Sequence, residues 1–372
     1  MIRLLIYNNN IIENILDIMN MFPNRKFPLF RFSTSHRFFS NSSCRTQQRT
    51  LKKSIYFSGI SLHNGKQVNL SIHPSTHVNN STGILFQTPN GMIPASYENV
   101  SSTNFCTTLC GFKTSNEAGS LSNIYFVHTV EHLLAAFYIC NIQNAIVEID
   151  GEELPILDGS SQPYCDAFEG NVAPIQNNKV LKTLKILKPI KVQSGDSHAT
   201  FFPNNVENEN DNKNNNIPSR GGSSGTLSIS VDVDFEPFSL PRDQIEVNDL
   251  EFLKEISSAR TFTFEHVISK LKEDGLIKGG SMENAIVYDK NGIPLNKEPL
   301  RFENEFSRHK ILDCIGDLSL LGNDRKSIDK IDGRYVVYKP GHTINNKMVN
   351  KLMKILEEEE QELIENRTVV IV

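Results

Sequence analysis

The sequence predicts an α+β protein made of two similar units. The chain has 372 residues, which exceeds one ordinary domain and is enough for two units that each bury a core. Short stretches of alternating polar and apolar residues, typical of strands, outnumber the longer periodic runs typical of helices. The order strands, helix, strands, helix occurs in residues 49–178 and again in residues 179–372. This repeat predicts two α+β domains with these bounds.

The charge distribution separates the first 48 residues from the rest. These residues contain six Lys or Arg and two acidic residues, and residues 18–48 contain no acidic residue. The remaining chain holds 32 basic and 41 acidic side chains, a net charge of −9, which argues against a nucleic-acid partner. The six cysteines form no C-x-x-C pair and are expected to be free thiols.

Residues 1–48 are typical of a targeting segment. They are rich in Arg, Ser and Phe, a composition found in organelle transit peptides. We expect a mitochondrial location, the alternatives being another organelle, the cytoplasm, or a leader that is simply a disordered tail. Polar and acidic residues interrupt the apolar stretch 2–18, so we expect no transmembrane segment there or later in the chain.

In the first unit, strands are expected before and after a central helix. Asn64-Gly65 is a hairpin signal between stretches 54–59 and 68–72. The other expected strands are 83–87, 104–109, 125–127 and 145–150, and a second helix is expected at 164–168.

In the second unit, strands are expected at 186–192, 198–202 and 227–233, with helices at 249–257 and 265–274. Residues 203–225 are rich in Asn, Gly and Ser. They have no apolar face to bury, so they predict a disordered insertion.

The sequence His128-Thr129-Val130-Glu131-His132 precedes the apolar run of the first helix. If the helix includes all five residues, His128 and His132 share one face, with Glu131 beside them as a base. Taken alone, the stretch matches the H-x-x-E-H pattern of inverzincin peptidases and equally two ordinary surface histidines.

A second group of metal-binding residue types recurs every four positions in the last helix of the second unit. His309, Asp313 and Asp317 share one helix face, while apolar residues cover the opposite face. His342 follows on a turn after Gly341. A charged helix face is commonly only solvated, and a loop histidine commonly has no special role. The presence of this group together with residues 128–132 favours a metal or catalytic site.

The ordered motifs resemble the UDP-3-O-acyl-N-acetylglucosamine deacetylases, the zinc amidases of bacterial lipid A synthesis. The resemblance runs from Arg49 to about Leu352. The motifs that carry it are Ser61-Leu62-His63-Asn64-Gly65-Lys66, Thr129-Val130-Glu131-His132-Leu133, Ile142-Gln143-Asn144-Ala145, Pro155-Ile156-Leu157-Asp158-Gly159-Ser160, Ala259-Arg260-Thr261-Phe262, Gly279-Gly280-Ser281, Arg301-Phe302-Glu303, Arg308-His309-Lys310-Ile311-Leu312-Asp313 and Gly341-His342. It implies two similar domains, each a β-sheet with two helices, with the helices packed between the sheets. With the leader, it implies a eukaryotic, organelle-targeted member.

The resemblance also implies the reaction and its residues. The reaction is hydrolysis of the N-acetyl group of UDP-3-O-[(3R)-3-hydroxyacyl]-N-acetylglucosamine. Zn²⁺ would be held by His132, His309 and Asp313, which leave a fourth position open, as in catalytic zinc sites. The residues with implied catalytic roles are Glu131 as base, His342 as acid, Asp317 as the partner of His342, and Thr261 as a hydroxyl near the reacting oxygen. The implied substrate contacts are Lys310, Phe262, Phe264, Gly280 and His63, with residues 265–280 as the acyl-chain passage.

Other outcomes remain open at the level of sequence. An inverzincin-type peptidase needs His128 as a ligand, whereas the resemblance leaves His128 outside the metal set. Cys106 lies where the family often has a cysteine near the site, although a buried cysteine usually serves packing. A catalytically silent sugar-lipid binder should have lost at least one residue of the proposed site, and none is lost: the chain has Glu131, His132, His309, Asp313 and His342. The expected partner is a small-molecule UDP-acyl-amino sugar, and the expected state is a monomer.

Overall fold

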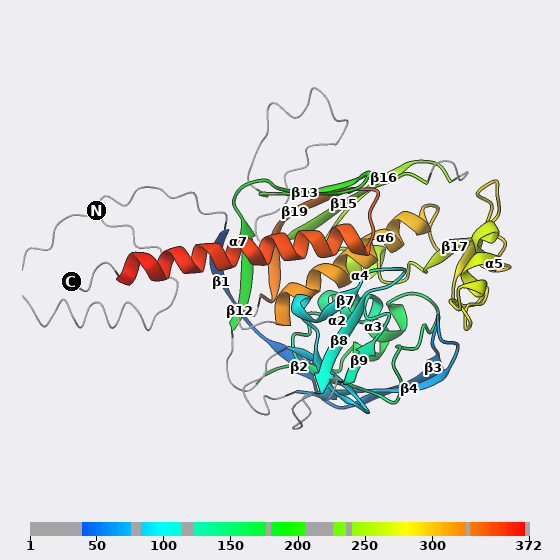
Figure 1. Ribbon diagram of the computed structural model, residues 1–372, viewed down its shortest axis with the longest axis horizontal. Coiled ribbons are helices and arrows are strands. Elements are labelled where there is room, and N and C mark those ends of the chain that lie inside the picture. Colours follow the sequence, from blue (N-terminus) through cyan, green and yellow to red (C-terminus); the bar gives the residue numbers. More distant parts are fainter. Residues whose placement is uncertain are drawn as a thin grey trace, which may run out of the picture.

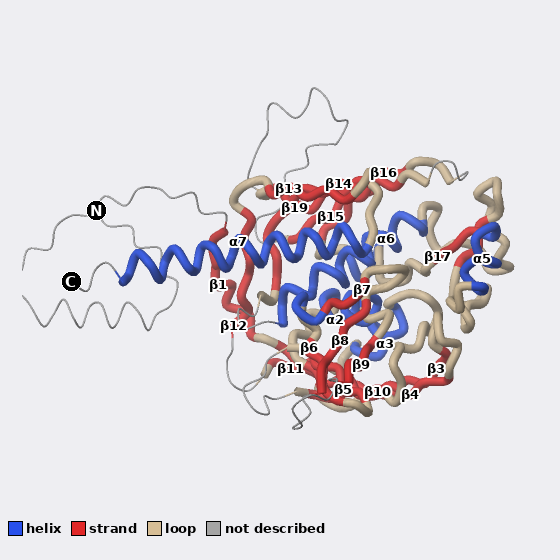
Figure 2. Tube along the Cα trace, in the orientation of Figure 1, coloured by secondary structure: helices blue, strands red, loops and turns tan. Residues whose placement is uncertain are grey.

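Two β-sheets enclose a layer of helices in a computed structural model of the chain (Figure 1). The structure describes residues 39–75, 83–113, 123–175, 180–204, 226–235, 240–323 and 328–368. The α+β class and the placement of helices between the sheets are confirmed (Figure 2). Among the described residues, no helix combines the length and the apolar character needed to cross a bilayer.

The first sheet has five strands in the order β3-β4-β10-β5-β6. Their bounds are Ile55–Ile60 (β3), Gln67–Pro74 (β4), Ala145–Ile149 (β10), Ile84–Thr88 (β5) and Gly91–Pro94 (β6). The β3–β4 hairpin turns where the sequence predicts it, with Gly65 at φ +67°. Helices α2 (Glu131–Ile139) and α3 (Gln162–Phe168) share one core with this sheet.

A three-stranded sheet, β7-β8-β9, stands beside the first sheet. Its strands are Val100–Ser102 (β7), Thr108–Lys113 (β8) and Asn123–Val127 (β9), and the short 3₁₀ helix η1 (Tyr97–Asn99) precedes them. The prediction of a strand at 104–109 is wrong for its first four residues. They form a tight connection in which Phe105 has a left-handed backbone, φ +66°.

The second sheet is built around β19 (Lys330–Tyr338), with the strand order β1-β12-β19-β14-β13. The other bounds are Phe39–Gln47 (β1), Val180–Ile186 (β12), Ile190–Ser194 (β13), Ser197–Phe202 (β14), Leu227–Val233 (β15) and Asp243–Asn248 (β16). Strand β15 pairs with β16 and, in parallel, with β19. The single strand expected at 186–192 is two strands, because Pro189 lies in the break between β12 and β13.

Strand β1 differs from the expected disordered leader. Residues 39–47 pair antiparallel with β12 at the edge of the second sheet, although their sequence is mostly polar. Residues 1–38 and 205–225, which hold most of the predicted leader and of the predicted insertion, lie outside the described residues.

Helices α6 (Glu305–Leu318) and α7 (His342–Thr368) pack against the second sheet with their own core. In Figure 1, α2 and α6 lie side by side between the sheets, and α7 runs across α6. The contact between α2 and α6 is so close that a Cβ atom on Gly316 would lie 2.1 Å from the Glu131 carbonyl oxygen. The first turn of α2 is therefore fixed against the last turns of α6.

Smaller elements complete the fold. Strands β17 (Phe262–Phe264) and β18 (Ile286–Tyr288) form a parallel pair that carries α5 (Glu265–Glu273) between them in sequence. Strands β2 (Arg49–Leu51) and β11 (Val172–Pro174) pair antiparallel. The remaining helices are α4 (Phe252–Glu255), shorter than the predicted 249–257, and the 3₁₀ helix η3 (Ser319–Asn323).

Candidate metal centre and active site

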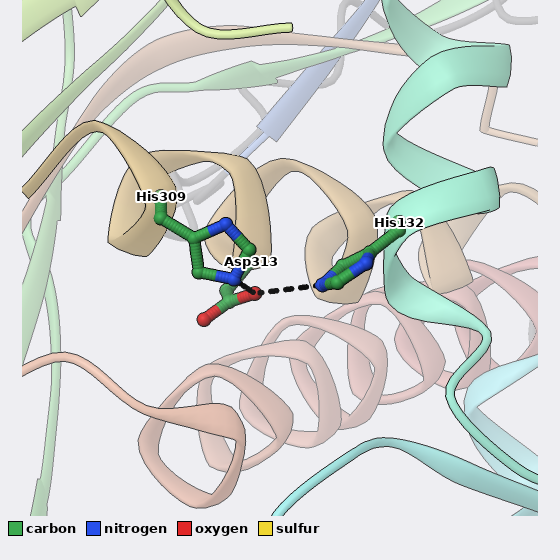
Figure 3. Close-up of side chains that lie close together, drawn as sticks. All are labelled: His132, His309 and Asp313. Carbon is green, nitrogen blue, oxygen red and sulfur yellow. Dashed lines mark ion pairs between the residues drawn. The ribbon is translucent and has the colours of Figure 1, made fainter. Parts of the chain in front are cut away.

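Helix α6 presents three polar side chains on successive turns, all nearly inaccessible to solvent. His309, Asp313 and Asp317 are each 2 % exposed. The Nδ1 atom of His309 lies 3.0 Å from the Ala259 carbonyl oxygen, so it is Nδ1 that donates to this acceptor. Its Nε2 atom then faces the carboxylate of Asp313, 3.4 Å from Oδ1 (Figure 3).

Helix α2 contributes its first two residues, Glu131 and His132, and begins later than predicted. Thr129 has a left-handed backbone, φ +59°, and His128 forms a β-bridge with Glu153 before the helix starts. His128 therefore does not share a helix face with His132, as one interpretation of the sequence required. The His128 ring instead lies 2.9 Å from the Thr108 hydroxyl and stacks on Phe126.

His132, His309 and Asp313 form a group that fits a metal ion. Their ligand atoms all lie within 4.8 Å of one another, and His132 Nε2 is 3.9 Å from Asp313 Oδ1. This Oδ1 atom is buried without a hydrogen-bond partner, an arrangement that a bound cation would satisfy. Within the ranges that the structure describes, no other three His, Cys, Asp or Glu residues bring their ligand atoms this close together.

The electrostatics also fit cation binding. Burial lowers the pKa of His132 to about 3 and lowers that of His309, so both imidazoles are neutral at neutral pH. Burial alone would raise the pKa of Asp313, but Lys310 and the nearby histidines lower it overall. Two neutral imidazoles and one carboxylate are ligands that zinc accepts.

Glu131 lies next to this group without belonging to it. Its Oε2 atom accepts a hydrogen bond from the Thr107 backbone N–H at 3.0 Å, and its Oε1 atom is 3.9 Å from His342 Nε2. Burial raises the pKa of Glu131 to about 7. A carboxylate with this pKa exchanges protons readily at neutral pH, as a general base must.

Asp317 is the centre of a second polar group. Its Oδ2 atom accepts from His342 Nδ1 and from Asn345 Nδ2, both at 2.9 Å, and its Oδ1 atom accepts from the Thr107 hydroxyl at 2.6 Å. Burial alone would lower the pKa of His342, but the Asp317 carboxylate raises it to about 10. The imidazole is therefore protonated at neutral pH, and its Nε2–H faces the space beside Glu131.

Lys310 and Phe262 border the metal group. The Lys310 ammonium donates to Asp313 Oδ2 at 2.8 Å and lies 5.4 Å from the centre of the Phe262 ring. Thr261 is half-buried, two residues after the Ala259 carbonyl that holds His309, and its backbone binds Gly159 and Ile286. Phe264 is 8 % exposed and belongs to the core between the second sheet and helices α6 and α7. Its ring therefore packs mainly against protein.

His63 and Gly280 lie together where the turn after α5 meets the β3–β4 hairpin. The backbone N–H of Lys278 donates to the His63 carbonyl, and a Cβ atom on Gly280 would lie 3.6 Å from the Leu62 side chain. Both ring nitrogens of His63 are buried without a hydrogen-bond partner. The structure does not place His63 or Gly280 in the metal group.

Cys106 is buried close to Glu131. Burial raises its pKa to about 12, so the thiol stays protonated and is a poor nucleophile. Two residues with direct contacts in the site were not predicted: Thr107 and Asn345. Asn345 lies one helical turn after His342, a spacing that could have indicated it, whereas Thr107 has no comparable signal.

The class of protein that these features define is a metal-dependent hydrolase. Its site has a buried metal-binding triad, a carboxylate beside one of the three residues, and a protonated histidine that faces this carboxylate. The particular family follows from comparison with known proteins. The family model "LpxC: UDP-3-O-acyl N-acetylglycosamine deacetylase" matches residues 48–354, and the chain therefore belongs to this family.

Curated relatives agree with the family model. The UDP-3-O-acyl-N-acetylglucosamine deacetylase of Saccharophagus degradans is 38 % identical over 314 residues, 83 % of this chain and 90 % of that protein. The proteins of the same name from Teredinibacter turnerae and Pseudomonas entomophila are 37 % and 36 % identical, with 83 % and 82 % of this chain and 90 % of each relative covered. The comparisons give no support to the peptidase interpretation.

Proposed function

We propose that this protein hydrolyses the N-acetyl group of UDP-3-O-[(3R)-3-hydroxyacyl]-N-acetylglucosamine. Water cleaves the amide, and the products are acetate and UDP-3-O-acyl-glucosamine, which a pathway of the lipid A type uses. The observation that carries the proposal is the juxtaposition of the metal-binding triad, Glu131 and the His342–Asp317 pair where α2 meets α6. Family membership supports the choice of substrate.

We propose zinc as the metal, held by His132, His309 and Asp313. Three nitrogen and oxygen ligands with room for a further ligand are typical of catalytic zinc sites. Zinc bound there would lower the pKa of a water molecule and polarise the acetamide carbonyl. The hydrogen bond between His309 and the Ala259 carbonyl holds that ring in the orientation that a ligand needs.

Glu131 acts as the base in this proposal. Its carboxylate lies close to Asp313 and His342, so it would accept a proton from a water molecule that attacks the amide at the metal. The Thr107 N–H holds one carboxylate oxygen, which leaves Oε1 on the side of His342.

His342 acts as the acid. Since the pKa is about 10, its ring carries a proton at neutral pH, stabilises the negative charge that develops on the amide oxygen, and then protonates the leaving sugar amine. Asp317 holds the ring at Nδ1 on the other side and keeps Nε2 directed into the site, and Asn345 in turn donates to the Asp317 carboxylate.

Substrate contacts are proposed for the residues around this centre. Lys310 would bind an oxygen of the substrate, and the Phe262 ring would offer an apolar face beside it; the position of both at the metal group supports this. Thr261 would supply a hydroxyl to the reacting oxygen. Phe264, Gly280 and His63 would shape the passage for the acyl chain along residues 265–280, with His63 offering two ring nitrogens that have no protein partner.

Release of acetate tests the function directly. The full-length chain, incubated with the UDP-acyl-N-acetylglucosamine substrate, should release acetate and form a free amine in equal amounts. Removal of metal by a chelator should stop the reaction, and Zn²⁺ should restore it. Binding of the substrate without acetate release by zinc-loaded protein would identify a silent sugar-lipid binder instead.

We propose a mitochondrial location for the protein, with residues 1–38 as the targeting segment of a eukaryotic member. The composition of these residues supports the proposal. A fluorescent fusion of residues 1–48 that stays in the cytoplasm would exclude it.

We also propose that the protein is a monomer, which light scattering in solution would test.

A further inference from the structure

We propose that Thr107 is a positioning residue that holds the base Glu131 and the histidine partner Asp317 in fixed relation to each other. The inference rests on the roles proposed above for Glu131, Asp317 and His342. Thr107 belongs to neither catalytic helix: it precedes β8, in the connection from β7.

Every polar group of Thr107 binds the site or its framework. The backbone N–H donates to Glu131 Oε2 at 3.0 Å, the hydroxyl donates to Asp317 Oδ1 at 2.6 Å, and the carbonyl oxygen accepts from the Val130 N–H at 3.4 Å. The side chain is 2 % exposed, so water does not compete for these bonds. One residue thus connects the first turn of α2 to the last turn of α6.

The local backbone explains how one residue reaches both helices. Phe105, two positions earlier, has a left-handed conformation, φ +66°, which is uncommon for a residue with a side chain. This turn sends the chain back toward the helices, so the N–H and the hydroxyl of Thr107 both point inward. Strained backbone of this kind persists where surrounding contacts fix it.

The hydroxyl of Thr107 completes the set of donors to Asp317. Oδ2 accepts from His342 and Asn345, and Thr107 is the donor to Oδ1. Without that donor, Oδ1 would be a buried charged atom with no donor among the residues that the structure describes, and the carboxylate would turn to recover a hydrogen bond. The His342 ring would follow the carboxylate and leave the orientation in which Nε2 faces the substrate.

Replacement of the hydroxyl alone tests this role. Thr107→Val keeps the size of the side chain and the N–H bond to Glu131 but removes the bond to Asp317. Because it leaves a buried acceptor of a charged group unsatisfied, we expect kcat to fall by about 10- to 100-fold. KM and bound zinc should stay near the wild-type values, since neither substrate binding nor the metal ligands are touched. Thr107→Ser, which restores the hydroxyl, should recover kcat to within about 3-fold.

Thr108→Val is the matched control. It removes a buried hydroxyl from the neighbouring residue, which contacts His128 and the Cys106 thiol, both outside the metal group, and it should leave kcat unchanged. If Thr107→Val keeps wild-type kcat, or if Thr107→Ser loses as much activity as Thr107→Val, the inference is overturned.

A double-mutant cycle separates this inference from the proposed function. If Thr107 acts through Asp317, Thr107→Val should cost little further activity in an Asp317→Ala background, and additive losses would overturn the inference. Asp317→Ala alone reports on the proposed roles. If it keeps full activity, the roles of Asp317 and His342 are wrong and the inference is overturned with them. If it lowers kcat while Thr107→Val does not, only the inference about Thr107 is overturned.

Discussion

Helices α2 and α6 supply the same site in different ways. Helix α6 presents His309, Asp313 and Asp317 on successive turns of regular backbone, where the four-residue spacing alone sets the face. Helix α2 presents Glu131 and His132 from its first turn, where the preceding left-handed residue Thr129 decides where the helix begins. Spacing within a regular helix therefore places the residues of α6, whereas Glu131 and His132 depend on where α2 begins and Glu131 also on a contact from Thr107.

The largest expected effect concerns the proposed metal ligands on α6. His309→Ala and Asp313→Ala should each lower zinc affinity by more than about 100-fold and abolish turnover, because loss of a ligand exceeds the effect of losing an outer contact. Metal analysis of the purified variants measures this.

His128→Ala is the control on the α2 side. It precedes the helix, binds Thr108, and should retain zinc. Loss of zinc with His128→Ala and retention with His309→Ala would restore the peptidase interpretation and remove the contrast between the helices.

The pH profile of turnover should show a bell that depends on both helices. Activity should rise as Glu131 loses its proton, with a pKa of about 7, and fall as His342 loses its proton, with a pKa of about 10. The two apparent values belong to the coupled site, and bound metal, a positive charge, should shift both to lower pH.

Removal of charge at α6 should move the alkaline limb. Asp317→Asn removes the carboxylate that raises the pKa of His342, so the limb should shift to lower pH, and His342→Ala should lower turnover by about 10²- to 10⁴-fold and weaken that limb. An alkaline limb unchanged in both zinc-loaded variants would show that His342 is not the acid.

A smaller effect is expected where the two helices touch. In Gly316→Ala, the added methyl group would overlap the Glu131 carbonyl, so α2 and α6 must separate. Overpacking of this kind should lower the free energy of unfolding by about 1–3 kcal/mol, measured as a lower melting temperature, and displace Glu131. Gly341→Ala, with no atom within 4 Å of the added carbon, should leave the melting temperature unchanged. Equal melting temperatures for both variants would show that the helix contact is looser than described.

The smallest effect is expected from the Asn-rich insertion. Its ends are close, since the Asn204 side chain donates to the Thr226 carbonyl at 2.6 Å. Replacement of residues 205–225 by a short Gly-Ser linker should leave melting temperature and turnover nearly unchanged, because loop length has a small entropic cost. A large loss of either property would mean that the insertion contributes to the site that the two helices build.

The sequence predicted regular features better than irregular ones. The α6 face and the β3–β4 hairpin follow from periodicity and from Asn64-Gly65, which are local signals. The start of α2 was misplaced because nothing in the sequence near Thr129 indicates a left-handed backbone. Strand β1 was missed because pairing with β12, rather than its own mostly polar sequence, makes it a strand.

Some contacts between distant segments could not be predicted. Thr107 and Asp317 are 210 positions apart, and no periodicity relates them. The ligand group and the Asp317–His342 pair were predicted by family resemblance and are brought together in the structure. The contacts of Thr107 and Asn345 with Asp317 become visible only when the segments are packed.

The most direct measurement compares the two neighbouring residues of α2. Glu131→Ala and His132→Ala should be assayed together for bound zinc and for acetate release. We expect Glu131→Ala to keep zinc and to lower turnover by about 10²-fold or more, because it removes a base and not a ligand, and we expect His132→Ala to lose both zinc and turnover. Loss of zinc from Glu131→Ala, or retention of wild-type turnover by that variant, would contradict the division of roles between these residues.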